Sequence, residues 1–322
     1  MLPCWLVVLV VMAVLEVRGL RKRYGRVVAV DGVSFSAGRG VHGLVGPNGA
    51  GKTTTLKSIV GLVVPDAGEV LFNGVDLLSP RGWRLRGEIG YVAEVPVLPD
   101  DYVVVELLEE LALVEGLDRL SARREARRVL EEVGLDRLAD RKVRGLSKGE
   151  RKRLYFAQAL LQQRSLYVLD EPFSGLDPEA VAWARSLVSR LGREATVLLS
   201  SHLLREVEEL AGSVTIIYGG RVLFSGALEE LARMAGGGVV AELSVDRPEE
   251  AARLLGGEGY EAEASGSRLV VRLDSREDAA RVVSLLSSRG FMVYESRLRG
   301  RSLEEAYLEL IARAARGEKV GA

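Results

Sequence analysis

Cysteine and histidine are almost missing from this chain. Among 322 residues, Cys4 is the only cysteine, and His42 and His202 are the only histidines. One cysteine excludes a disulfide framework or a cysteine-based zinc site within one chain, and two histidines make a histidine metal centre a poor candidate. A reducing cytoplasm is the natural compartment for such a composition.

An excess of charge of one sign is also missing. The 44 lysines and arginines are balanced by 45 acidic residues, which gives a formal net charge of -1. The overall basic footprint of a nucleic-acid-binding protein is therefore absent. The arginine pairs at 123–124 and 127–128 alternate with glutamates, as on a solvated helix face. We predict no nucleic-acid partner.

An apolar run long enough to span a membrane is missing from the start of the chain. Met1 to Leu15 carry no charge, but a membrane span needs about 20 apolar residues. A signal peptide would need a basic start and a small-residue cleavage site, and neither precedes Glu16. We expect residues 1–12 to be an apolar tail or the product of a misassigned start, with Met12 the true one; peripheral membrane contact and export are the alternatives.

One glycine-rich stretch dominates what the sequence does contain. The P-loop pattern is fitted by Gly46, Pro47, Asn48, Gly49, Ala50, Gly51, Lys52 and Thr53, with Thr54 following. A buried strand is expected over Val41–Val45 and a helix over Thr54–Val60, so the loop would open onto a helix N-terminus, which favours phosphate. Lys52 would face the β- and γ-phosphates of a nucleotide, and the Thr53 hydroxyl would ligate Mg²⁺.

An acidic pair follows a second apolar strand. Leu166–Leu169 lead directly into Asp170 and Glu171, and burying unpaired carboxylates is costly. A magnesium ion bound through Asp170 would remove that cost and leave Glu171 to orient and deprotonate a water. His202 stands just after the expected strand Thr196–Ser200, where ligands bind in open α/β sheets.

The patterns predict two domains. Residues 13–235 are typical of an α/β fold: a P-loop NTPase with a mixed sheet, an antiparallel β-layer, and a helical insert over about 95–163. Ser147 and Gly149, at the start of a basic helix, form by themselves a weak anion-site signal. Residues 239–322 alternate strand, helix, two strands, helix and strand, which is a ferredoxin-like α+β order, and end in a helix from Leu303 to Ala314.

Taken in order, these motifs resemble the nucleotide-binding subunit of ATP-binding cassette (ABC) transporters. The resemblance covers about Ala13 to Met234 and rests on an ordered set: Tyr24, Gly46–Thr53, Leu146–Glu150, Leu166–Glu171, Ser174–Asp177 and His202. It implies ATP and Mg²⁺ as cofactors, with Lys52, Glu171 and His202 as the catalytic residues.

The resemblance also assigns a role to residues whose chemistry is obscure alone. Tyr24 would stack on adenine, and His202 would contact the γ-phosphate and the attacking water. Ser147 and Gly149 would close over the γ-phosphate held by a second ATPase subunit. The working enzyme would then be a head-to-tail dimer, and the intact motifs permit a homodimer.

Two positions depart from the usual family pattern. Glu94 replaces a glutamine; its oxygen can still reach Mg²⁺, but it adds negative charge near the phosphates. The signature reads Ser-Lys-Gly-Glu where Ser-Gly-Gly-Gln is usual. These variants and the C-terminal domain resemble the type-2 exporter branch, whose ATPases drive separate transmembrane permease subunits from the cytoplasmic face of the cell membrane. The alternative is a soluble ABC ATPase acting on ribosomes or DNA.

Overall fold

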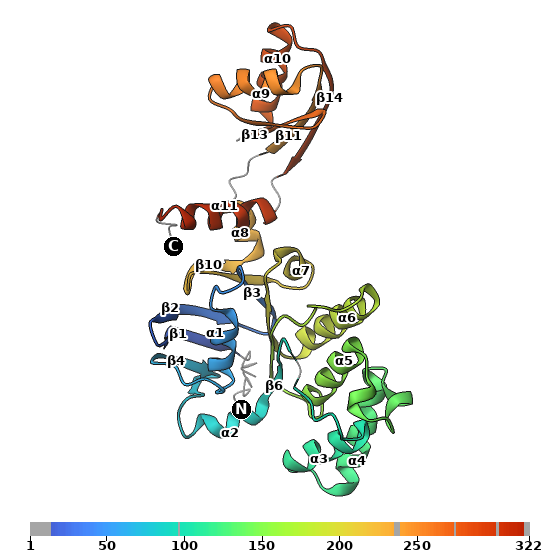
Figure 1. Ribbon diagram of the computed structural model, residues 1–322. Coiled ribbons are helices and arrows are strands. Elements are labelled where there is room, and N and C mark those ends of the chain that lie inside the picture. The colour runs from blue at the N-terminus through green and yellow to red at the C-terminus, as the bar shows by residue number, and fades with distance from the viewer. Residues whose placement is uncertain (1–13, 96, 235–238, 274, 301–302, 319–322) are drawn as a thin grey trace, which may run out of the picture. The chain divides into compact units, whose positions relative to one another are not determined.

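The computed structural model describes residues 14–95, 97–234, 239–273, 275–300 and 303–318. The chain divides into two compact units between Ser225 and Gly226, and both are drawn in Figure 1. Helix α8 (Leu228–Met234) therefore belongs to the second unit. The domain limits inferred from sequence, 13–235 and 239–322, stay a prediction, and the expectation for residues 1–12 falls outside the described residues.

One layer of the first unit is an antiparallel sheet. Its strands, in spatial order, are β2 (Val27–Ala37), β1 (Leu15–Tyr24), β4 (Ala67–Phe72) and β5 (Val75–Asp76). The hairpin between β1 and β2 turns at Gly25, whose φ of 58° suits glycine. Apolar residues on these strands face inward, as the alternation in the sequence predicts.

The other layer is a six-stranded sheet in which β3 runs parallel to β8 and β9, and β7 runs parallel to β8 and β6. Its strands, in spatial order, are β10 (Arg221–Ala227), β9 (Ser213–Tyr218), β3 (Gly40–Val45), β8 (Thr196–Ser201), β7 (Leu166–Leu169) and β6 (Ile89–Val92). Strands β7 and β8 are buried along their whole length and β3 from Val41 onward, because a parallel sheet is covered on both faces.

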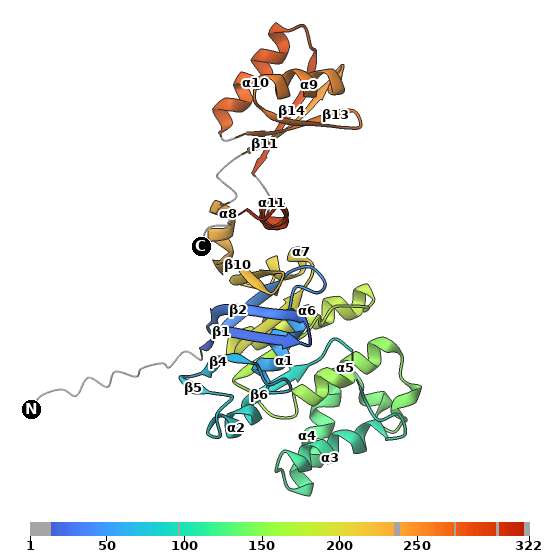
Figure 2. The same ribbon diagram turned by 60° about the vertical axis from the view of Figure 1, so that its left-hand side comes forward.

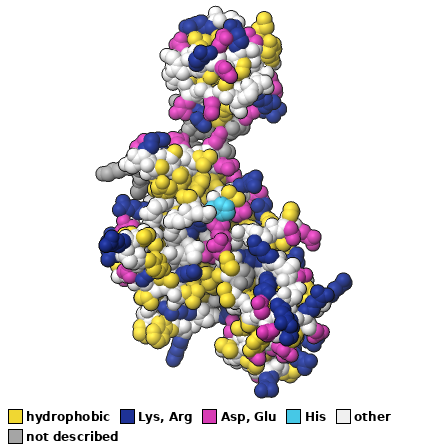
Figure 3. Space-filling model, in the orientation of Figure 1, with side chains coloured by type: hydrophobic (Ala, Val, Ile, Leu, Met, Phe, Trp, Pro, Cys, Tyr) yellow, Lys and Arg dark blue, Asp and Glu magenta, His cyan; other side chains and the backbone are white. Residues whose placement is uncertain are grey.

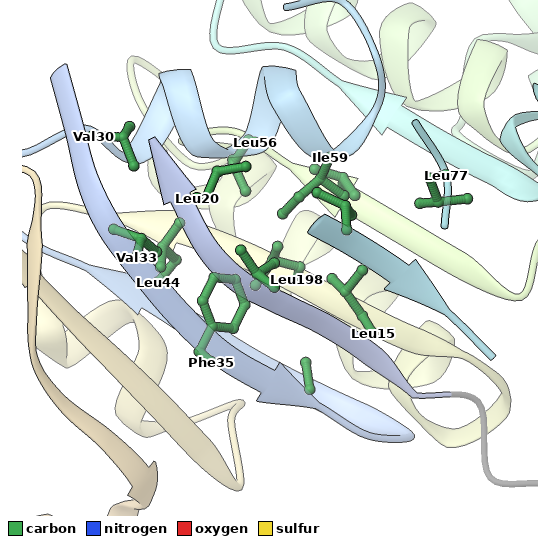
Figure 4. Close-up of a cluster of buried hydrophobic side chains, with 14 of the residues drawn as sticks. Leu15, Leu20, Val30, Val33, Phe35, Leu44, Leu56, Ile59, Leu77 and Leu198 are labelled. Carbon is green, nitrogen blue, oxygen red and sulfur yellow. The ribbon is translucent and has the colours of Figure 1, made fainter. Parts of the chain in front are cut away.

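A buried cluster joins the two layers. Leu15, Leu20 and Phe35 from the antiparallel sheet meet Leu44 and Leu198 from the parallel one, with helix α1 (Lys52–Ile59) packed alongside, as Figure 4 shows. Because α1 contributes Leu56 and Ile59 to this cluster, the core fixes the helix that follows the glycine-rich loop.

Helices cover the remainder of the first unit. The helical insert contains α3 (Val104–Val114), α4 (Arg119–Glu132) and α5 (Lys148–Ala159), with short 3-10 turns at Asp136–Leu138 and Val143–Gly145. Elsewhere lie α2 (Gly82–Leu85), a 3-10 turn at Arg86–Glu88, α6 (Pro178–Glu194) and α7 (Leu204–Glu208). The insert confirms the predicted helical segment. On the face of the molecule drawn in Figure 3, basic and acidic side chains are interspersed over the surface of the insert.

The second unit contains a four-stranded antiparallel sheet with two helices on one face. In spatial order the strands are β12 (Glu261–Ser265), β13 (Arg268–Leu273), β11 (Val239–Val245) and β14 (Val293–Gly300), and the helices are α9 (Pro248–Gly257) and α10 (Arg276–Ser288). Figure 2 shows α9 and α10 together on one side of the sheet. This order confirms the ferredoxin-like prediction. Helix α11 (Leu303–Ala315) lies near α8 in the same unit.

Candidate functional site

The glycine-rich loop connects β3 to α1 along a path that excludes side chains. A Cβ on Gly46 would lie 2.2 Å from the Ile217 carbonyl oxygen, and one on Gly51 would lie 2.5 Å from the Ala29 carbonyl oxygen. Gly51 also has a φ of 105°, which other residues rarely adopt. The helix begins at Lys52, two residues earlier than predicted, so Lys52 and Thr53 occupy its first turn, where unpaired N–H groups collect.

Lys52 is buried at the base of the loop. Its side chain is 5% exposed, and its Nζ donates to the Gly46 carbonyl oxygen at 2.7 Å. The same Nζ lies 3.3 Å from Glu171 Oε1. A buried ammonium group is costly unless paired, so the loop and the acidic pair at the end of β7 form one electrostatic unit.

Asp170 lies under the loop and is 1% exposed. Its Oδ1 accepts from the Ser200 hydroxyl at 2.7 Å and from the Thr53 hydroxyl at 3.3 Å. A buried carboxylate beside a threonine hydroxyl is a hard oxygen set that suits Mg²⁺, which binds through one or two protein oxygens and completes its shell with water and phosphate. Among the described residues, no group of three or more His, Cys, Asp or Glu side chains is placed to hold a metal.

Glu171 adopts an unusual backbone conformation. Its φ of 44° is positive although it is not glycine, a strain that costs about 1–3 kcal/mol where neighbours enforce it. The Ser200 hydroxyl accepts from its amide at 2.9 Å, and its Oε2 lies 2.9 Å from His202 Nδ1. Its Oε1 is buried and, within the described part of the chain, has the Lys52 ion pair but no hydrogen bond.

These residues surround a cleft of about 490 Å³. It is lined by Tyr24, Ala29, Asn48, Gly49, Ala50, Gly51, Lys52, Thr53, Thr54, Glu94, Glu171, Ser174 and His202. The fold thus brings residues from five separate stretches of sequence into one cleft. Asp170 is buried and does not line the cleft. Gly46 and Pro47 do not line it either, but their carbonyl oxygens accept hydrogen bonds from Nζ of Lys52, which does. Tyr24 is 49% exposed, so its ring is open to a stacking partner.

Ser147 and Gly149 are not among the residues that line this cleft. Ser147 caps α5: its hydroxyl accepts from the Glu150 amide at 3.3 Å, while Glu150 Oε2 accepts from the Ser147 amide at 2.7 Å. This reciprocal capping box explains what the glutamate of the variant signature does structurally. Ser147 is exposed, and Gly149 is half-buried.

Lys152 is a site residue that the sequence reasoning missed. It is 3% exposed, and its Nζ donates to the carbonyl oxygens of Ala93 at 3.0 Å and Glu94 at 2.9 Å, with that of Glu171 at 3.5 Å. Burial lowers the pKa of Lys152 to about 8, against the opposing effect of nearby carboxylates. Its spacing in the sequence could have revealed it. Lys152 lies on the same helix face as the apolar Phe156 and Ala159, which predicts a buried lysine.

Ser200 was missed as well. It comes two residues before His202, and its hydroxyl joins the Asp170 carboxylate to the Glu171 amide. By contrast, His42 is structural, as expected: its ring nitrogens pair with the hydroxyls of Ser213 and Thr215 at 2.8 Å. Burial lowers the pKa of His42 to about 4, so its ring is neutral at pH 7.

Known proteins resemble this chain in sequence and in fold. The sequence model of the family described as ABC transporter matches residues 30–174. The Nod factor export ATP-binding protein I of Ralstonia nicotianae is 39% identical over 80% of this chain and 80% of its own length, and that of Cupriavidus pinatubonensis is 34% identical over 98% of this chain and 95% of its own. The chain belongs to the ABC transporter family. It is an ATP-binding subunit of that family and an ATPase, as the motif set implied.

Solved structures agree with this assignment. A structure of an ATP-binding subunit of an ABC transporter has a TM-score of 0.63 and 32% identity, and covers 69% of this chain and 93% of that one. An ATP-binding cassette in its ADP conformation has a TM-score of 0.59 and 27% identity, and covers 68% of this chain and 92% of its own. The α/β P-loop fold is thus confirmed. The described helices include none with both the length and the apolar character that a bilayer crossing requires.

Proposed function

We propose that this ABC subunit hydrolyses ATP with Mg²⁺ and powers export through a separate transmembrane subunit, at the cytoplasmic face of the cell membrane. The observation that carries the proposal is the cleft that joins Lys52, Glu171 and His202 beside the glycine-rich loop. These three groups suit phosphoryl transfer to water. The lysine would neutralise phosphate charge, and the carboxylate and the imidazole would position and deprotonate the attacking water.

The loop and the buried aspartate would hold the nucleotide. Helix α1 begins at Lys52 beside the cleft, and the amides of its first turn would bind the phosphates. Lys52 would exchange part of its contact with Glu171 for the β- and γ-phosphates. Thr53 and Asp170 would hold Mg²⁺, with Glu94 at the margin; the bound ion would neutralise charge that develops on the phosphates. Tyr24, open to solvent on one side of the cleft, would stack on the adenine ring.

Glu171 would act as the general base. Its strained backbone aims the carboxylate into the cleft between Lys52 and His202. The Oε1 lone pairs are free of hydrogen bonds from the described residues, so they could accept a proton from water. His202, hydrogen bonded to Oε2 through Nδ1, would fix the orientation of the carboxylate and present the other ring edge to the γ-phosphate.

The signature residues support a homodimer. Ser147 and Gly149 lie outside this chain's own cleft, yet the exposed N-terminus of α5 is suited to an anion. A second copy, placed head to tail, would bring this terminus over the γ-phosphate. One chain carries both half-sites, so two identical copies would complete two sites.

The direction of transport is proposed from the relatives. Both relatives described above are named as export proteins, and the second matches the second unit as well as the first. The cargo would be selected by the transmembrane subunit.

A substitution at Glu171 tests the catalytic assignment. Glu171→Gln should leave ATP binding intact and lower the turnover number by about 10²–10⁴-fold, the range for loss of a general base. Steady-state ATPase assays and nucleotide titrations measure the two effects, and Glu179→Gln, at an exposed position of α6, is the matched control. Hydrolysis by Glu171→Gln at the parent rate would remove Glu171 from the base role.

A pull-down tests the partner. The tagged chain, purified from detergent-solubilised membranes of its host, should carry with it a polypeptide with several membrane spans. Co-purification with ribosomes and without any membrane protein would favour the ribosome alternative.

A further inference from the structure

The two edge strands of the sheet in the second unit, β14 and β12, differ in the side chains that they expose. Strand β14 ends the order β12-β13-β11-β14 and, among the described residues, pairs with β11. Beside and on it lie exposed apolar side chains: Met292 is 63% exposed, Tyr294 66% and Leu298 40%. An edge with open backbone groups and exposed apolar side chains is a template for a further strand.

The sequence of β14 is complementary to itself. In an antiparallel pair centred on Ser296, Glu295 of one copy faces Arg297 of the other, and symmetry makes this contact twice. Leu298 and Tyr294, the latter at a bulge in the pairing with β11, flank these charge pairs on either side. Opposite charges and aromatic–aliphatic pairs are both favourable across strands. The β11 register is regular from Glu295 to the end of β14, so the central residues form an undistorted strand.

The charged groups on this edge are available to a partner. The side chains of Arg297 and Glu295 are 68% and 53% exposed, and they form a long ion pair of 3.9 Å with each other along the strand. Such an exposed pair contributes little to stability. In the pairing with β11, Arg297 stands opposite the oppositely charged Glu242, whereas Glu295 stands opposite the uncharged Ser244.

The opposite edge is protected against the same pairing. Strand β12 carries exposed Glu261 and Glu263 on either side of Ala262. Two copies of β12 paired about Ala262 would place Glu261 opposite Glu263, and like charges in that position repel. Charges of this kind are a usual guard on edge strands.

We propose that β14 pairs antiparallel with β14 of a second copy of this chain and joins the two sheets into one. The contact is separate from the head-to-tail contact of the ATPase sites and requires no nucleotide. Two paired strands form a small interface, so we expect a weak dimer that is measurable at high protein concentration. This dimer would keep two ATPase units at high local concentration and so favour closure of the sites.

A symmetric disulfide tests the register. In a Cys4→Ser background, Ser296→Cys places two cysteines opposite each other at the two-fold axis, where antiparallel strands hold Cα atoms about 4.5–5.5 Å apart, within the range of a disulfide. We expect rapid covalent dimerisation of the full nucleotide-free chain under mild oxidation. Glu263→Cys, on the β12 edge, is the control and should cross-link at least tenfold more slowly. Equal rates for the two variants would overturn the proposal.

A charge exchange tests the recognition. Glu295→Arg alone puts Arg297 of the partner opposite another arginine, and Arg297→Glu alone pairs two glutamates. Each should raise the dissociation constant in sedimentation experiments about tenfold, since two symmetric pairs are lost. The double variant Glu295→Arg/Arg297→Glu restores opposite charges and should recover the parent constant. A double variant as weak as the single variants would contradict the pairing.

The ATPase contact is measured apart from this one. ATP added to Glu171→Gln should drive head-to-tail dimerisation whatever residue stands at position 296. If that ATP-dependent dimer forms while Ser296→Cys does not cross-link faster than its control, the β14 contact is wrong and the proposed function stands. If ATP produces no dimer but Ser296→Cys cross-links faster than its control, the β14 contact stands and the head-to-tail dimer of the proposed function is wrong.

Discussion

At the scale of single residues, the catalytic assignment depends on groups that hold Glu171 in place. The carboxylate sits on a left-handed backbone conformation, which needs support from its neighbours. Ser200 supports its amide, and Lys152 approaches its carbonyl oxygen while binding the carbonyls of Ala93 and Glu94. We infer that Lys152 is a positioning residue, which ties helix α5 to both β7 and the segment after β6.

The titration of Lys152 gives a measurable consequence. Since its pKa is lowered to about 8 by burial, the ammonium form that makes the three contacts is present at pH 7 and is lost as pH rises through 8. We expect ATPase activity to fall over that range. Lys152→Arg stays charged and should move the fall to higher pH, while Lys152→Met should lower kcat about tenfold with little change in KM, because the carbonyl oxygens lose their donor.

The control for this prediction is Arg127→Met, at an exposed position of α4. It should leave both the kinetic constants and the pH profile unchanged. If Lys152→Arg keeps the alkaline fall of the parent, another group titrates near pH 8 and Lys152 does not cause the effect.

At the scale of elements, the end of helix α5 packs closely against strand β6 at a glycine. A Cβ on Gly90, in β6, would lie 2.6 Å from Tyr167 Cδ1 and 2.9 Å from the Ala159 carbonyl oxygen at the end of α5. The side chain and the carbonyl are both buried or fixed by packing, so neither can move freely. Glycine at this position thus sets the spacing between β6, β7 and the helix that carries Ser147 and Lys152.

We predict that Gly90→Ala lowers the free energy of unfolding of the first unit by about 1–3 kcal/mol, the usual cost of overpacking. Denaturant titration followed by circular dichroism measures it. Gly87→Ala is the matched control, because a Cβ there meets no atom within 4 Å. Equal stability of the two variants would show that the close contacts around Gly90 do not limit the size of its side chain.

Most elements follow from local sequence. Strand β7 has the limits expected from its pattern, and β3 and β8 differ from theirs by one residue, because each is an apolar run bounded by clear turn residues. The glycine-rich loop, the acidic pair and His202 were likewise predictable, since each stands at a strand end. The roles of Lys152 and Ser200 were not, because their partners are 19 to 59 residues away in sequence and depend on tertiary packing.

At the scale of the whole molecule, the central question is whether one chain contains a complete ATPase site. The cleft is lined by the glycine-rich loop, Glu171 and His202, but Ser147 and Gly149 are absent from its lining. If a second copy supplies them, two differently damaged chains should repair each other. A chain that works alone cannot be repaired in this way, because its defect stays in its only site.

We predict such repair for a specific pair of variants. Ser147→Arg blocks the signature and leaves the cleft intact, while Lys52→Ala/Glu171→Gln disables the cleft and leaves the signature intact. Each alone should be inactive as a homodimer. Mixed in equal amounts, half of the dimers contain both chains, and one of their two sites combines an intact cleft with an intact signature. ATPase activity should therefore rise to at most about a quarter of the parent value. A mixture that stays inactive under conditions where the parent dimerises would contradict the shared site, whereas activity in Ser147→Arg alone would show that one cleft suffices.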